Sequence, residues 1–241
     1  MSTALRILIT GFGPFPGAPY NPTPELVERL LRLRRPAFAE IERIGHVFPV
    51  SYRAVDWQLP ELLALYRPDA LMMFGLAART PYLRIETRAR NAVSLLWPDA
   101  AQQRGRRACI AMGAAPESFG TLPRQLLRAA SATGIDARLS RDAGRYLCNY
   151  LCWRAIEATR LPCGLKLAAF VHVPLVARPG SAMQHSARGR ISAEQLVDAG
   201  EAMLMTTLSA TRRRLRETAA PRPALTASAA AADSAAEFLP G

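Results

Sequence analysis

A cysteine at the expected start of a helix is the residue of this sequence best placed for covalent chemistry. Cys148 follows a short strand-like segment and a turn in which Asp142 or Gly144 is the expected helix cap. In the first turn of a helix, a sulfur lies among backbone N–H groups that have no partner within the helix. These groups favour a thiolate and can stabilise an oxyanion. The alternative is that Cys148 is a small buried apolar residue.

A histidine and a carboxylate near predicted strand ends are the candidate partners of this thiol. His172 lies near the end of the apolar run 166–174, where it is either a general base or a packed core residue. Glu86 lies in the extended segment 83–91, in which charged side chains alternate with smaller or apolar ones, so one face is charged. Glu86 is therefore either a site carboxylate or an ordinary salt-bridge partner of the neighbouring arginines.

Two aromatic residues follow the first predicted strand. Phe12 and Phe15 lie in the loop 11–17, at a strand end where open α/β sheets bind ligands, and the alternative for both is core packing under the loop. The loop fits a dinucleotide-binding motif poorly, because its glycines are spaced G-x-G-x-x-x-G and its prolines lack the N–H groups that hold phosphate. A nucleotide-binding enzyme is not expected.

Strand-like and helix-like segments alternate along the chain, which predicts an α/β domain with a largely parallel or mixed sheet covered on both faces. Ser192 and Gln195 form a capping-box pattern before the last helix. The predicted strands are 5–10, 41–50, 70–75, 83–91, 137–140 and 166–174, and the predicted helices are 23–31, 53–66, 122–134, 148–159 and 192–216, with 91–113 and 178–190 as loops.

Composition limits the class of protein. The chain has 241 residues, half of them apolar, which predicts one domain over 1–217 followed by a low-complexity, disordered tail over 218–241. No apolar run approaches the ~20 residues of a membrane span, and the first residues do not form a secretory signal. We therefore expect a soluble cytoplasmic protein with no membrane partner.

Charge and cysteine content exclude two further classes. The net charge of +12 comes almost entirely from arginines that are spread along the chain, so a nucleic-acid partner is not expected. The four cysteines are scattered and there are only three histidines, so neither a disulfide framework nor a metal site is predicted.

Four motifs in register resemble pyroglutamyl peptidase I, the pyrrolidone-carboxylate family of cysteine peptidases. The likeness runs from about residue 5 to residue 208 and omits only the tail. Each motif is weak alone, and four in the family's order and spacing are specific. They are Gly11-Phe12-x-Pro14-Phe15 with Asn21-Pro22, Glu86 five residues before Asn91, Ala143-Gly144-x-Tyr146-x-Cys148-Asn149, and Phe170-x-His172-x-Pro174.

The resemblance implies a three-layer α/β/α sandwich that hydrolyses the amide bond after an N-terminal pyroglutamyl residue. It makes Cys148 the nucleophile, His172 the general base and acid, and Glu86 the acidic partner, with Asp99 as an alternative orienting acid. It also assigns Phe12, Phe15 and Asn21 to substrate binding.

The resemblance implies no cofactor and no metal. It also implies pyroglutamyl peptides as partners and leaves a homodimer or homotetramer open. A non-catalytic or differently specific small-ligand-binding protein of the same fold is the alternative.

The sequence departs from the family pattern beside the expected site. Leu76, Ala77 and Ala78 follow the third predicted strand, where family members often have an amide-bearing residue and a second glycine. An arginine common in the family is absent from 94–96, and Thr87 follows Glu86 in place of another arginine. These changes bear on substrate affinity and oxyanion support more than on the class of reaction.

Overall fold

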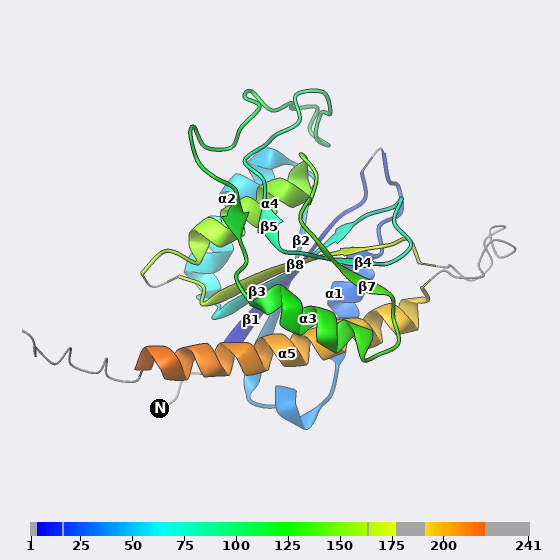
Figure 1. Cartoon of the computed structure of the whole chain (residues 1–241), viewed down its shortest axis with the longest axis vertical. Coiled ribbons are helices and arrows are strands. Elements are labelled where there is room, and N and C mark those ends of the chain that lie inside the picture. Colours follow the sequence, from blue (N-terminus) through cyan, green and yellow to red (C-terminus); the bar gives the residue numbers. More distant parts are fainter. Residues whose placement is uncertain (1–3, 16, 163, 177–190, 220–241) are drawn as a thin grey trace, which may run out of the picture.

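The computed structural model describes residues 4–15, 17–162, 164–176 and 191–219, and Figure 1 shows its helices and strands. The predicted loop 178–190 lies outside the described residues, as does the predicted tail beyond residue 219. The strands are β1 (Leu5–Phe12), β2 (Ile41–Phe48), β3 (Ala70–Leu76), β4 (Leu83–Glu86), β5 (Arg88–Ala89), β6 (Glu117–Ser118), β7 (Ala137–Ser140) and β8 (Leu167–Val173). The helices are α1 (Thr23–Arg32), the 3₁₀ turn η1 (Pro36–Phe38), α2 (Tyr52–Tyr66), α3 (Leu122–Ser131), α4 (Leu147–Ala158) and α5 (Ala193–Ala219).

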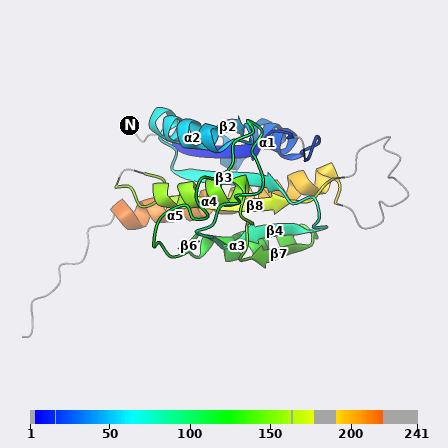
Figure 2. The same cartoon turned by 90° about the horizontal axis from the view of Figure 1, so that it is seen from above.

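The main sheet has six strands in the order β2-β1-β3-β8-β4-β7, which Figure 2 shows side by side. Neighbouring strands are parallel except for β4 and β8, which are antiparallel. The predicted mixed, largely parallel sheet is therefore confirmed. The predicted extended segment 83–91 divides at Thr87, because only its first part joins this sheet, while β5 pairs with β6 in a separate two-stranded sheet.

Alternating side chains of the strands build two cores, one on each face of the sheet. In β1, Ile7 and Ile9 face helices α1, α3 and α5, whereas Leu8 and Phe12 face α2 and α4. Figure 1 shows the two groups of helices on opposite sides of the strands. The structure is thus a three-layer α/β/α sandwich, as expected.

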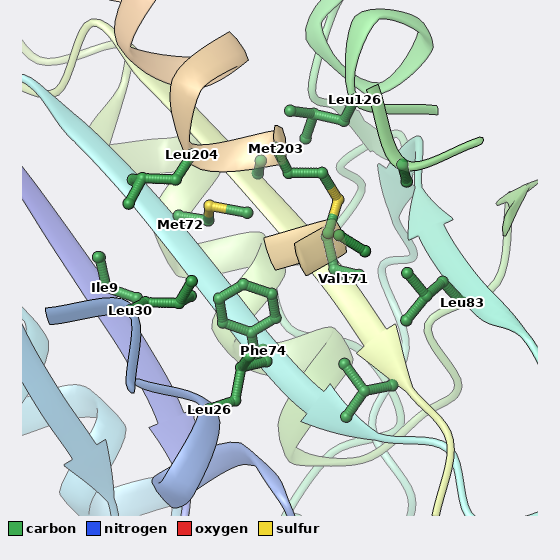
Figure 3. Packing of buried hydrophobic residues seen from close by; sticks show 14 of the residues in the cluster. Ile9, Leu26, Leu30, Met72, Phe74, Leu83, Leu126, Val171, Met203 and Leu204 are labelled. Carbon is green, nitrogen blue, oxygen red and sulfur yellow. The ribbon is translucent and has the colours of Figure 1, made fainter. Parts of the chain in front are cut away.

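The core beneath α5 is formed by large side chains of the central strands, and Figure 3 shows how they interlock. Met72 of β3 lies beside Met203 and Leu204 of α5, Phe74 belongs to the same cluster, and Leu126 of α3 lies near Met203. These side chains are almost fully buried, so this core fixes β3, a strand that also forms part of the site.

Helix ends follow the predictions in part. The capping box of α5 forms in both directions, since Ser192 N–H donates to Gln195 Oε1 at 2.9 Å and Gln195 N–H donates to Ser192 Oγ at 3.1 Å. The predicted cap of α4 is wrong. Tyr146 is the N-cap, while Asp142 uses its side chain to accept the Gly144 N–H at 2.9 Å within the preceding turn.

The end of one further element differs from the predictions. Helix α5 continues to Ala219, past the domain boundary expected at residue 217. None of the helices in the described part of the chain is long and apolar enough to cross a membrane.

The core beneath α5 yields a stability prediction. Leu126→Ala removes a side chain with no solvent exposure and should lower the free energy of unfolding by about 2–5 kcal/mol, because it leaves a cavity between α3 and α5. Leu65→Ala is the control, since Leu65 on α2 is 67% exposed and its loss should cost under ~1 kcal/mol. Urea unfolding followed by circular dichroism measures both, and equal losses would contradict this description of the core.

Candidate active site

The thiol of Cys148 lies in the first turn of α4, where the sequence predicts it. Cys148 is the second residue of the helix and is partly exposed. The Tyr150 N–H bonds the Tyr146 C=O at 3.0 Å, so the N–H groups before it have no partner within the helix. Cys152, one turn deeper, is fully buried, and burial foremost raises the pKa of its thiol. Cys148 is therefore the accessible thiol of this helix, beside free backbone donors.

The His172 ring connects this thiol to the sheet. His172 lies near the end of β8, is 5% exposed, and is opposite Gly75, the glycine that the sulfur of Cys148 approaches, so that this sulfur contributes to the pKa of the ring. Its Nδ1 lies 2.7 Å from Oε1 of Glu86, which leaves Nε2 as the ring nitrogen available to the sulfur. The structure thus brings Cys148, His172 and Glu86 together, and we call them the thiol–imidazole–carboxylate cluster.

Glu86 meets both of the alternatives that the sequence left open. It ends β4 with no solvent exposure, and its Oε1 bonds the His172 ring and also pairs with Arg84 Nη2 at 3.1 Å. Its Oε2 has no hydrogen-bond partner among the residues that the structure describes. A buried carboxylate needs partners such as His172 and Arg84, because removing an unpaired charge from water is costly.

Opposing effects set the pKa of His172. Burial lowers it, but the negative charge and hydrogen bond of Cys148, together with those of Glu86, outweigh burial and raise the pKa to about 9. At neutral pH this raised pKa favours the protonated imidazole, which is a suitable partner for a deprotonated sulfur.

Gly75 makes room for the sulfur. It lies in β3 directly opposite His172 of β8. A Cβ atom at this position would lie 2.8 Å from Sγ of Cys148 and 2.7 Å from Cζ of Phe170, closer than real Cβ contacts allow. The sequence showed this glycine only as the end of a strand, because its neighbours from α4 and β8 are distant in the chain.

The carboxylate of Asp99, the alternative orienting acid, bonds backbone N–H groups, whereas Glu86 bonds the His172 ring. Oδ2 of Asp99 accepts the Tyr52 N–H at 3.0 Å, and its Oδ1 accepts the N–H groups of Ala101 and Gln103 at 2.9 and 2.8 Å. Asp99 is buried, and its carboxylate fixes the start of α2 to the loop that follows β5.

Two predicted substrate-binding residues have structural positions. Phe12 is 3% exposed and packs on Phe48 within the core beneath α2 and α4, because β1 extends two residues beyond its predicted end. Asn21 donates to the Gly13 C=O at 3.3 Å and accepts the Thr23 N–H at 3.0 Å, so it holds the loop against the start of α1. The substrate-binding roles of Phe12 and Asn21 stay predictions.

Phe15 does line a cavity of about 740 Å³, whose wall includes Arg84, the ion-pair partner of Glu86, but none of the three residues of the cluster. Its ring contacts that of Tyr146, two residues before Cys148, with centroids 6.4 Å apart. Tyr146 is a wall residue not predicted from the sequence, although its spacing from Cys148 was the available signal. The other lining residues are Gly17, Ala77, Ala78, Arg79, Thr80, Arg84, Trp97, Pro98, Asp99, Ala100 and Gln102.

Two asparagines hold the long loop that forms part of this wall. Asn149, next to Cys148, accepts the Arg90 N–H at 2.8 Å and donates to the carbonyls of Arg90 and Ala92. Asn91 accepts two backbone N–H groups and donates to two carbonyls between residues 110 and 114.

The described ranges contain no group of three or more His, Cys, Asp or Glu side chains suited to a metal ion.

Comparison with known proteins points to one family. The family model for pyroglutamyl peptidase matches residues 5–209. A pyrrolidone-carboxylate peptidase from Thermococcus onnurineus is 30% identical over 86% of this chain and its own full length, and one from Vibrio vulnificus is 32% identical over 84% of this chain and 92% of its own.

Solved structures share the fold. The pyrrolidone carboxyl peptidase from Thermococcus litoralis superimposes with a TM-score of 0.76 over 87% of this chain and 96% of that one, at 24% identity. A variant of the Pyrococcus furiosus enzyme gives 0.75 over 86% and 99%, at 25% identity.

The contact between Gly75 and the sulfur can be tested without a substrate. Gly75→Ala should slow alkylation of Cys148 by iodoacetamide roughly tenfold or more, because the added methyl group displaces the thiol from His172. Gly13→Ala is the matched control, since its Cβ would meet nothing closer than 3.8 Å. Mass spectrometry of the labelled peptide gives the rate, and an unchanged rate in Gly75→Ala would contradict the close packing.

Proposed function

The chain belongs to the pyroglutamyl peptidase family, and we propose that it is a cysteine exopeptidase that removes N-terminal pyroglutamyl residues. The observation that carries the proposal is the cluster of Cys148, His172 and Glu86 at the start of α4. A neutral imidazole alone would not distinguish catalysis from core packing. A protonated imidazole between a thiol and a buried carboxylate supports the catalytic interpretation.

The proposed reaction has two steps on the sulfur. The Cys148 thiolate attacks the carbonyl carbon of the pyroglutamyl residue, and the free N–H groups of the first turn of α4 stabilise the oxyanion. His172 gives its proton to the leaving amine as the C–N bond breaks, which leaves a thioester on Cys148. Water then attacks the thioester with His172 as base, releasing pyroglutamate and restoring the thiolate and the imidazolium.

Glu86 is proposed to orient the imidazole and to stabilise its charged form. The Nδ1–H donates to Glu86 Oε1, so Nε2 faces the sulfur and carries the proton that is transferred. The cytoplasm is the proposed location, where free thiols stay reduced.

The cavity suits a neutral lactam. A pyroglutamyl ring has no terminal ammonium, so it needs flat apolar walls and a few amide partners instead of an acidic anchor. Phe15 and Tyr146 offer such walls. Ala77 and Ala78, which follow β3 in the chain, add small apolar surface to the cavity. We propose that this cavity holds the pyroglutamyl residue and accepts the start of the peptide that follows it.

The nucleophile can be tested with a pyroglutamyl amide that releases a fluorophore. The wild type should release it under reducing conditions, and Cys148→Ala should lose at least ~10⁴-fold of the rate, because no other group replaces the sulfur. Cys109→Ala, which removes another partly exposed thiol, is the control and should keep the wild-type rate. An inactive wild type with a folded circular dichroism spectrum would instead favour a binding protein of the same fold.

The proton on His172 predicts the alkaline limit of activity. The active form carries this proton, so kcat/KM should be retained below pH 9 and fall about tenfold per pH unit above it, as His172 loses the proton. Glu86→Gln removes a negative charge beside the ring, which lowers the pKa of His172 and moves this limb to lower pH by about one unit.

Asp99→Asn is the matched control for the acidic partner. It removes a carboxylate that bonds backbone N–H groups only, so the alkaline limb should stay at its wild-type position. A shift with Asp99→Asn and none with Glu86→Gln would assign the orienting role to Asp99 instead.

A further inference from the structure

Arg84 lies on the strand face that carries the cluster. In the antiparallel pairing of β4 with β8 it is opposite His172, and in the parallel pairing of β4 with β7 it is opposite Arg138. Because side chains alternate along a strand, Arg84 and Glu86 project to the same face, which α4 covers. Arg84 is therefore next to both members of the cluster that the sheet supplies.

Three contacts anchor the guanidinium at this place. Its Nη2 pairs with Glu86 Oε1 at 3.1 Å, donates to Ser140 Oγ at 2.9 Å, and also donates to the Asp142 C=O. The side chain is 24% exposed and forms part of the wall of the cavity. One nitrogen of the cation is thus fixed on a fully buried carboxylate, while the side chain also forms part of the cavity wall.

We propose that Arg84 is a positioning residue that balances the charge of the buried Glu86 carboxylate and thereby sets how many protons the cluster holds. This inference depends on the proposed function, because it assigns a purpose to the protonation state of the cluster. Arg84 acts through Glu86 and has no role in bond making.

The other charged groups around the cluster do not replace Arg84. Cys148 and Cys152 of α4 and Glu86 can only add negative charge. Tyr52 of α2 and Tyr146 before α4 face Cys148, and burial foremost raises the pKa of both phenols, so they stay neutral. Asp99 bonds backbone N–H groups, and the Asp142 carboxylate pairs with Arg90 at 2.7 Å. Arg79 lines the same cavity, but among the described residues the arginine that pairs with Glu86 is Arg84.

Counting charges gives the consequence. A thiolate, an imidazolium, a carboxylate and the Arg84 guanidinium sum to zero, whereas the cluster without Arg84 carries a net negative charge in a poorly solvated place. Removing a nearby cation favours the proton-bound form, so it raises the apparent pKa of every step in a coupled titration. Both the acidic and the alkaline limbs of the activity profile should therefore move to higher pH.

The test compares pH profiles of kcat/KM for three substitutions. Arg84→Met should move both limbs upward by about one pH unit, and Arg84→Lys, which restores the charge, should return them toward the wild type. Arg138→Met is the matched control, because Arg138 is opposite Arg84 one strand further from His172 and pairs with Asp136 at 2.9 Å. Its limbs should coincide with those of the wild type.

Several results would overturn the proposal. Arg84→Met limbs that stay in place, that move to lower pH, or that move no more than those of Arg138→Met would show that Arg84 does not set the protonation of the cluster. If Arg84→Met does not fold, Arg84→Gln removes the same charge and keeps a polar end for Ser140, and the same criteria apply.

A substrate-independent measurement separates this proposal from the proposed function. The pH dependence of iodoacetamide alkylation at Cys148 reports the same coupled titration and should also move upward in Arg84→Met. A wild type that hydrolyses no pyroglutamyl amide contradicts the peptidase assignment. An active wild type with unmoved Arg84→Met profiles contradicts only the role of Arg84.

Discussion

A single carboxylate withdrawn from water is the constraint on which the site depends. Glu86 has no solvent exposure, and its charge is tolerable there only because His172 and Arg84 both bond the same oxygen. The antiparallel pairing of β4 with β8 makes this possible, since it places Arg84 beside His172. Glu86 lies two residues further along β4 and therefore on the same face of the sheet. The sheet thus supplies the histidine, its acid and a balancing cation, while α4 supplies only the sulfur and the free N–H groups.

Most elements could be predicted from the sequence because their signals are local. Apolar runs ended by glycine or proline mark the buried strands, and a capping box marks the start of α5. The alternation of charge in 83–91 also placed Glu86 on a charged face, and both interpretations of that residue turned out to describe real contacts. The position of Cys148 in the first turn of α4 likewise followed from the turn before it.

The contacts that join distant segments could not be predicted in this way. Phe12 became a core residue because β1 is longer than its apolar run indicates, and Asp99 and Asn21 use their side chains on backbone groups that no spacing reveals. Gly75 and Arg84 gain their significance from β8 and α4, which lie far along the chain. Strand register determines such contacts, and register depends on the whole sheet.

Asn91 and Asn149 hold the cavity wall through side-chain amides that bond only backbone groups, whatever the side chains along that wall. The described wall between β5 and α3 is consequently a module whose surface can vary while its course stays the same. Because Asn149 directly follows Cys148, the bonds that fix this wall also tie it to the turn of α4 that carries the sulfur.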